Sequence, residues 1–330
     1  IFNLLKKKFE DYAINRHEPI TQELFKDLFL TLQSRYLLTQ NFEIDKSIYI
    51  KRTDLYENLD KALEKINYGY IIITGLPGSG KSTSLSMYFN NREKITNDEI
   101  IRYYCFVDIN ENTQNIRLQA KSLRINLLMT LQNRFSSILN RRFDYSEINF
   151  YKILKILGKF SIENNKRIII FLDGLDHVEK NKTKVHNHIL NAIPKDIPNG
   201  IIFVVGTQEL HNWPYFLKKC LDNKDRHINL SLFDLNKTRD FLIQKYKFKL
   251  LTEENIQEIH KKSEGLPIYL KYIADLLKKE LNISDKLKNI PAMVNGDIKS
   301  YYEILWNEFT EYGKGDVRYL CGVLACLRFL

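Results

Sequence analysis

A chain of 330 residues is longer than one average domain and long enough for two or three, each with its own core. Hydrophobic residues make up 44% of it and aromatic residues 12%, which excludes a wholly disordered protein. The formal net charge of +10 would suit a polyanionic partner, but lysine is spread along the whole chain. Short basic clusters such as Lys6-Lys7-Lys8 and Arg141-Arg142 favour solvated faces over nucleic-acid contacts.

The four cysteines have neither a metal-ligand spacing nor the pattern of a disulfide framework. Three lie in apolar runs, which predicts small buried side chains in a reducing compartment, and hence a cytoplasmic protein. No uncharged apolar run reaches the roughly 18 residues that a membrane span needs, so we expect no membrane partner.

The first elements are predicted to be helical. From Ile20 onward apolar residues recur at a spacing of three to four, and a polar connector follows over residues 40–47. Thr53 is expected to cap a helix that ends near Gly69.

Four short, β-branched or aromatic runs then predict strands. They are Tyr70–Thr74, Arg102–Asp108, Arg167–Asp173 and Gly200–Gly206. Long helical patterns over Asn115–Phe135 and Tyr145–Ile162 lie between them, so the fold class is α/β with a parallel sheet.

After Leu230 the strand signals nearly vanish. Helices are predicted over Asn236–Lys247, Thr252–Lys262, Pro267–Lys279 and Tyr301–Glu311. Helical material is therefore appended to the sheet domain.

The strand at Tyr70–Thr74 runs directly into Gly75-Leu76-Pro77-Gly78-Ser79-Gly80-Lys81-Ser82, and a helix pattern follows. This is the P-loop motif in the context that it requires, so the sequence predicts an Mg-nucleoside triphosphate site. The glycines let successive N–H groups point at phosphates, and the helix N-terminus adds positive potential. Lys81 should reach the β- and γ-phosphates, Ser82 should bind Mg²⁺, and Thr83 should contact the α-phosphate.

Asp173 ends an apolar strand, where a carboxylate can hold the Mg²⁺ shell, the Walker B role. Asp176 lies three residues on and is expected to polarise the attacking water, with a helix-capping loop residue as the alternative. Thr207 and Gln208 follow the fourth strand, where they would sense the γ-phosphate or form an ordinary turn. No guanine-reading Asn-Lys-x-Asp pattern occurs, so adenine is the expected base and ATP/ADP with Mg²⁺ the expected cofactors.

Four motifs in this order resemble the STAND ATPases, the signal-transducing P-loop class that includes NACHT and NB-ARC proteins. They are Tyr49-Ile50-Lys51-Arg52 before the first helix of the domain, the P-loop, Asp173-Gly174-Leu175-Asp176, and Gly265-Leu266-Pro267. The resemblance implies that Ile50 and Arg52 lie on the adenine side and that Pro267 packs near the base. The alternative for the last motif is local, with Gly265 closing one helix and Pro267 starting the next.

The resemblance implies an ASCE/AAA+-like nucleotide-binding domain over residues 48–230, a helical lid over 231–290 and the beginning of a winged-helix domain over 291–330. Residues 1–47 would then link to an N-terminal effector. Both ends suggest a piece of a longer protein. Tyr103, Tyr104, Phe106 and Arg117, together with the ending at Gln208, are similar to bacterial antiviral STAND proteins of the Avs type. Gln208 departs from the arginine that many relatives carry at this point.

What the resemblance implies is an ATP-dependent switch that hydrolyses ATP slowly and forms a homo-oligomer when it recognises a trigger. The trigger would be a protein, phage-derived in antiviral innate immunity, sensed by a region beyond residue 330. The alternative is a DNA-handling AAA+ ATPase of the origin- or transposition-loader type, which the basic charge and the winged helix favour. Nucleic acid is the less favoured partner.

Overall fold

The computed structural model describes residues 38–107, 114–139, 146–180, 188–278 and 282–293. The predicted N-terminal helix, the helix over 301–311 and the start of a winged-helix domain all lie outside these residues. Contacts divide the chain into two compact units. The sheet unit contains Arg52–Gly75 and Lys81–Asn229 with residues 38–44, and the helical unit contains Asp45–Lys51, Leu76–Gly80 and the residues from Leu230 onward. The boundaries drawn from the sequence at 47, 230 and 290 stay predictions.

The sheet unit is built on five parallel strands in the order β2-β3-β4-β1-β5. Their bounds are β1 Gly69–Thr74, β2 Glu99–Tyr104, β3 Ile168–Asp173, β4 Ile201–Gly206 and β5 His227–Asn229. β4 thus separates the P-loop strand β1 from β3, which is the ASCE/AAA+-like arrangement of a P-loop domain. The α/β class is confirmed, and a strand lies at each of the four predicted places, although β2 covers Glu99–Tyr104 where the prediction was Arg102–Asp108. β5 was not predicted, because a strand of three residues with one buried side chain leaves no recognisable period.

The strand register brings several chain ends to one edge of the sheet. Asp173, the last residue of β3, pairs with Gly206 on one side and with Tyr104 on the other. Ile73 in β1 pairs with Gly206, and its carbonyl accepts a hydrogen bond from the Thr207 N–H at 3.0 Å. The carboxyl ends of parallel strands are where ligands bind in open α/β sheets.

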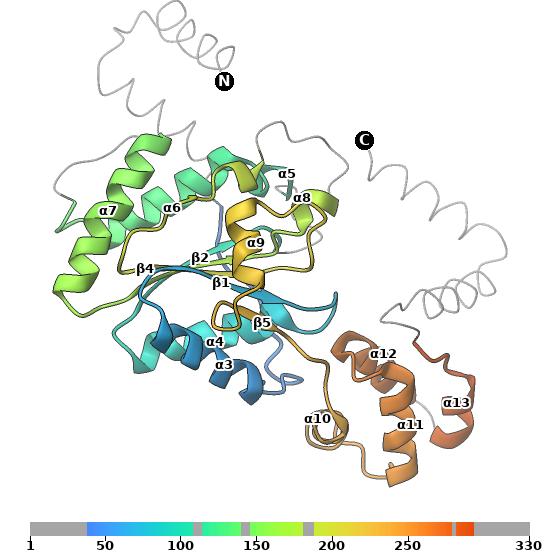
Figure 1. Cartoon of the computed structure of the whole chain (residues 1–330). Coiled ribbons are helices and arrows are strands. Elements are labelled where there is room, and N and C mark those ends of the chain that lie inside the picture. The colour runs from blue at the N-terminus through green and yellow to red at the C-terminus, as the bar shows by residue number, and fades with distance from the viewer. Residues whose placement is uncertain (1–37, 108–113, 140–145, 181–187, 279–281, 294–330) are drawn as a thin grey trace, which may run out of the picture. The chain divides into compact units, whose positions relative to one another are not determined.

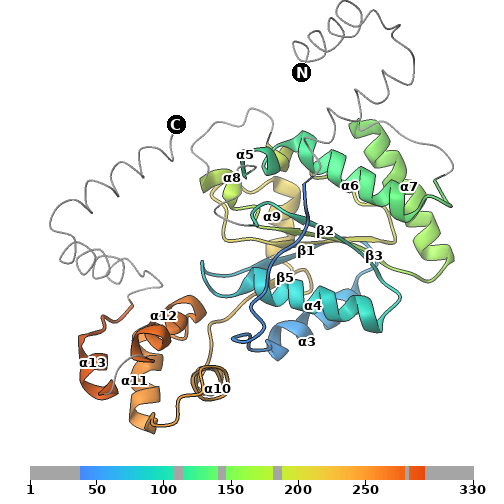
Figure 2. The same ribbon diagram turned by 180° about the vertical axis from the view of Figure 1, so that it is seen from behind.

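Helices cover both faces of the sheet (Figures 1 and 2). One face carries α3 (Thr53–Lys65) and α4 (Lys81–Ile95), and the other carries α6 (Ala120–Arg134), α7 (Glu147–Glu163) and α9 (Tyr215–Leu221). The layers bury a continuous apolar core, including Leu123, Leu128, Ile153 and Leu157 against the strands. Three short segments complete the unit: α5 (Gln114–Arg117), α8 (His177–Lys180) and the 3₁₀ turn η2 (Ile189–Asn191).

Two local predictions about these helices were wrong. The helix expected over Asn115–Phe135 is broken, because Gln119 is extended (φ −83°, ψ 138°) and forms a β-bridge with His188. Thr53 does not cap α3. It is the first helical residue, and Arg52 occupies the N-cap position with no side-chain capping bond.

The helical unit packs α11 (Glu253–Ser263), α12 (Pro267–Leu277) and α13 (Ile283–Asn289) with α10 (Leu235–Asp240), which continues into a π-helical turn η3 (Phe241–Lys245). Asp234 and Thr252 cap α10 and α11, their side-chain oxygens accepting bonds from Lys237 N–H and Asn255 N–H at 2.7 and 3.3 Å. The unit has its own core, which includes Leu242, Ile259, Leu270 and Ile273. Over the parts of the chain that the structure describes, no helix combines the length and apolarity that crossing a membrane requires.

Candidate nucleotide site

In the sheet unit, the P-loop lysine lies at the start of α4. The helix begins at Lys81, whose side chain is buried and whose ammonium donates a hydrogen bond to the Gly75 carbonyl at 2.7 Å. Ser82 and Thr83 form the first turn of the same helix. The N–H groups of a first turn lack intrahelical acceptors, so this end of α4 favours an anion.

Asp173 lies opposite this turn at the end of β3. It is 3% exposed, and its carboxylate accepts a hydrogen bond from the Ser82 hydroxyl. Burial raises the pKa of Asp173 to about 7, and the negative charge of Asp176 adds to the effect, while the Ser82 bond and the charge of Lys81 oppose it. The carboxyl group is therefore balanced between its neutral and ionised forms near neutral pH, and a cation beside it would favour the ionised form.

Gly206, which was not among the predicted site residues, makes room for that carboxylate. A Cβ atom at this position would lie 2.4 Å from Asp173 Oδ1. A glycine that ends an otherwise β-branched strand was the available sequence signal, because it marks close approach of another group.

The second carboxylate, Asp176, is held by the end of β4. Its Oδ1 accepts hydrogen bonds from the Gln208 backbone N–H at 3.1 Å and from the Thr207 hydroxyl at 3.5 Å. Asp176 and Thr207 are both buried. The structure thus brings Asp176, Thr207 and Gln208 together beside Asp173, and their roles toward water and the γ-phosphate stay hypotheses.

In the helical unit, Leu76–Gly80 packs against the start of α12. Gly78 has φ +71°, and a Cβ atom there would lie 2.2 Å from Ile268 Cγ2. The Ile268 N–H donates to the Gly78 carbonyl at 3.2 Å. Ser79 is 1% exposed, and its hydroxyl has no hydrogen-bond partner among the described residues. A buried unsatisfied hydroxyl is rare, and a phosphate oxygen is a partner that would satisfy it.

Pro267 is the first residue of α12, a position that proline favours. Before it, Glu264 closes α11 in the left-handed conformation and Gly265 has φ +73°. Local structure therefore accounts for Gly265 and Pro267, and the contact of Pro267 with adenine remains a hypothesis.

Ile50 and Arg52, which were predicted together on the adenine side, fall into different units. Ile50 packs on the apolar core of the helical unit. Arg52 belongs to the sheet unit, is 1% exposed and forms an ion pair with Asp54 at 3.3 Å.

Two further residues at the strand ends were not predicted to belong to the site. The Cys105 N–H donates to the Asp173 carbonyl at 2.8 Å, and its fully buried thiol has a raised pKa because of burial and the nearby carboxylates Asp173 and Asp176. The ring of His177 stacks on that of Phe106, with 4.6 Å between the ring centroids and an interplanar angle of 3°. Cys105 and His177 lie just beyond the ends of the paired strands β2 and β3, and local sequence patterns do not reveal that pairing.

The oxygen donors at this edge fit a magnesium–phosphate complex. Ser82 and Asp173 supply two hard oxygen groups, and Mg²⁺ is commonly held by one or two protein oxygens together with phosphates and water. Within the described residues no cluster of three or more His, Cys, Asp or Glu side chains could hold a metal by itself. The site therefore suits a cation that arrives with a nucleotide.

The chain matches the family model described as "Nephrocystin 3, N-terminal" over residues 56–205, which is under half of its length. No curated protein matches it. Solved structures that resemble it include the Drosophila ORC bound to DNA, with 12% identity, a TM-score of 0.43, and coverage of 87% of this chain and 70% of that one. Cdc6p from Pyrobaculum aerophilum has 13% identity and a TM-score of 0.43, covering 72% and 66%. The Aeropyrum pernix ORC2 protein, in ADPNP–ADP complexes, has 13% identity and a TM-score of 0.43, covering 76% and 73%.

These likenesses are remote, and the class of the protein rests on its own strand order and site. A P-loop between β1 and α4, with an acidic residue ending β3 two strands away, defines a P-loop NTPase.

Proposed function

We propose that the chain binds and slowly hydrolyses Mg-ATP as the nucleotide-controlled part of a STAND-type signalling switch. The observation that carries the nucleotide chemistry is the buried pair of Lys81 and Asp173 beside the half-buried Ser82, whose hydroxyl is hydrogen-bonded to the Asp173 carboxylate. Burying an ammonium and a carboxyl group is costly unless they are paired or bind a ligand, so a structural role alone explains this arrangement poorly.

Each residue has a distinct task in this proposal. Lys81 binds the β- and γ-phosphates, and Gly75–Gly80 orients them through backbone N–H groups. Ser82 and Asp173 hold Mg²⁺, which supplies charge neutralisation at the phosphates. Asp176, fixed by Gln208 N–H and Thr207, accepts the proton of the attacking water. Thr207 and Gln208 sense the γ-phosphate.

The switch part of the proposal rests on the helical unit and on the resemblance of Asp173–Asp176 and Gly265–Pro267 to STAND motifs. Nucleotide exchange or hydrolysis would change the helical unit through Gly78 and Ile268, and a trigger would then promote homo-oligomers that activate an effector, in antiphage defence. A two-state change from about 1:99 to 99:1 needs roughly 5.5 kcal/mol of differential binding. Phosphate contacts made in only one state would supply much of it.

The first experiment measures ATP affinity by calorimetry for the wild type, Lys81→Ala and Lys94→Ala, an exposed lysine at the other end of α4. A charge-assisted hydrogen bond contributes roughly 1.5–3 kcal/mol, so Lys81→Ala should weaken binding by at least about tenfold. The control should not change it. Equal affinity in all three proteins would contradict the site assignment.

The switch itself is tested by light scattering on the full-length protein, with and without trigger, for the wild type and Lys81→Ala. The wild type should assemble only with trigger and ATP. If both proteins show the same oligomeric state under every condition, the proposed switch is contradicted, while the proposed ATPase activity is not affected.

A DNA-handling AAA+ ATPase is the second candidate, and the net charge of +10 favours it. It predicts tight duplex-DNA binding whose affinity falls steeply with salt concentration. The switch predicts no such affinity for this chain, so one titration at two salt concentrations separates the two.

A further inference from the structure

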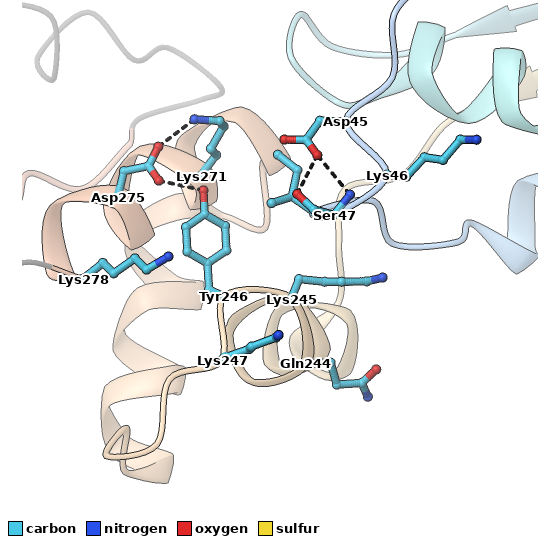
Figure 3. Close-up of a pocket in the computed structure, with 11 residues that line it drawn as sticks. Asp45, Lys46, Ser47, Gln244, Lys245, Tyr246, Lys247, Lys271, Asp275 and Lys278 are labelled. Atoms are coloured by element: carbon cyan, nitrogen blue, oxygen red, sulfur yellow. Dashed lines mark hydrogen bonds and ion pairs between the residues drawn. The ribbon is translucent and has the colours of Figure 1, made fainter.

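A second concave site lies in the helical unit and shares no residue with the P-loop. It is a pocket of about 660 Å³, within the range of small-molecule sites. Figure 3 shows its lining, which comes from the connector at Asp45–Ile48, from the π-helical turn with Tyr246 and Lys247, and from α12 with Lys271, Asp275 and Lys278.

One wall of the pocket is held rigid by Tyr246. Its ring is buried and packs at 5.0 Å from Phe241, and its hydroxyl donates to Asp275 Oδ1 at 2.8 Å. Lys278 Nζ lies 5.8 Å from the ring centroid. A fixed aromatic wall beside an ammonium group gives the pocket a defined shape before any ligand arrives.

The charge of the lining is strongly positive. Five lysines face two aspartates, and both aspartates already have donors: Asp275 accepts from Lys271 Nζ at 2.6 Å, and Asp45 accepts from the Ser47 N–H at 2.9 Å. Lys46, Lys245 and Lys247 form no ion pair or side-chain hydrogen bond with any described residue. In Figure 3, Lys278 and Lys247 lie near the Tyr246 ring, the Lys271 ammonium is directed at Asp275, and the ends of Lys46 and Lys245 point away from the ring.

The backbone at this pocket is also unusual. The turn Phe241–Lys245 is π-helical, a rare form that recurs at functional sites. Lys247 has φ +59°, a left-handed conformation that is unfavourable for a residue with a side chain. Strain of this kind persists where the surrounding structure enforces it, often at a ligand site.

We propose that this pocket binds a small ligand that carries two or more phosphate groups. Several uncompensated ammonium groups around one cavity suit concentrated negative charge, which a single carboxylate does not provide. Nucleic acid is less suitable, because its phosphates form an extended line, whereas these lysines border one cavity of small-molecule size. The pocket would let a second phosphate ligand act on the helical unit independently of the P-loop.

The test titrates inorganic tripolyphosphate into the full chain by calorimetry, in a Lys81→Ala background so that P-loop binding is suppressed. The pocket variant is Lys245→Gln with Lys247→Gln. The matched control is Lys249→Gln with Lys261→Gln, two exposed lysines of the same unit that do not line the pocket. Circular dichroism verifies that all the proteins fold alike.

The pocket variant should bind tripolyphosphate at least about tenfold more weakly, and the control should change by less than about threefold, since exposed charges outside the pocket are screened by solvent and salt. No binding in the Lys81→Ala background, or equal losses in both double variants, overturns the proposal. A twelve-nucleotide single strand that binds more tightly than tripolyphosphate, and loses affinity equally in both variants, would indicate an extended nucleic-acid surface instead.

Discussion

Replacing Gly78 by alanine tests whether the P-loop turn is packed on α12 as the structure shows. The added methyl group would lie 2.2 Å from Ile268 Cγ2 and 2.9 Å from Ile268 Cβ, both far inside van der Waals contact. Overpacking of this kind costs about 1–3 kcal/mol. The φ of +71° adds roughly 1–2 kcal/mol for a residue with a Cβ atom. Gly78→Ala should therefore lower the free energy of unfolding by about 2–5 kcal/mol.

The two contributions can be separated by a second substitution. Ile268→Ala removes the atom that clashes, so the double variant should recover the steric part, about 1–3 kcal/mol, and leave the dihedral part. Urea unfolding of the wild type, both single variants and the double variant gives this coupling energy as a cycle. Gly69→Ala is the control, since its φ of +102° is equally unsuited to alanine and its neighbour is the flexible end of Arg226.

A coupling energy near zero in that cycle would refute the packing of Gly78 on Ile268. The packing would also be refuted if Ile268→Ala restored the stability of Gly69→Ala as fully as it restores that of Gly78→Ala.

Three further predictions concern the carboxylates and Ser79. Asp176→Asn keeps an acceptor for the Gln208 N–H, so ATP affinity should stay unchanged while single-turnover hydrolysis falls about 10²–10⁴-fold, and wild-type rates would disprove its role as a base. The pKa of Asp173 is about 7 in the folded protein, against 3.8 for a free side chain. Between these two pH values the folded protein keeps a proton on Asp173 that the unfolded chain has lost, so the free energy of unfolding falls as the pH rises through this range. Comparing the urea unfolding of nucleotide-free wild type and Asp173→Asn at pH 5 and pH 8 should show a loss of about 2–3 kcal/mol in the wild type alone, and parallel curves would contradict it. Ser79→Ala should leave stability equal or higher, because its buried hydroxyl is unsatisfied, yet weaken ADP binding in calorimetry; a loss of stability with unchanged affinity would reverse the interpretation.

The sheet could be predicted largely because its signals are local. The residues Ile168–Leu172 are all apolar, as expected for a strand covered on both faces, and the P-loop motif fixes which turn joins β1 to α4. β5 escaped detection because its pairing with β1 is decided by tertiary contact, not by composition. The break at Gln119 has the same origin, since its bridge partner His188 is distant in sequence.

The site was predicted residue by residue, but its supporting groups were not. Lys81, Ser82 and Asp173 have motif positions, whereas Gly206 and Cys105 are defined only by the register of β2, β3 and β4. Register depends on long-range pairing, which periodicity along one strand cannot supply.

Ile50 and Arg52 join different cores, and their predicted contact with adenine stays a prediction. Their closeness in sequence suggested one adenine contact, yet the core of the helical unit takes Ile50 while Arg52 starts α3 in the sheet unit. Alternating burial along a connector does not reveal which of two cores a side chain joins.

The contact of Gly78 with Ile268 gives the proposed switch a short physical route. Gly78 accepts the Ile268 N–H, and glycine at this position leaves no side-chain atom between the loop and α12. The loop that would turn its N–H groups toward phosphates thus uses a carbonyl of the same turn to hold the first residues of α12. A change in the loop backbone on phosphate binding rotates that carbonyl, because peptide groups are rigid planes. The start of α12 would then have to adjust or lose its hydrogen bond, and in the proposed switch this single peptide group would transmit occupancy of the P-loop to α12.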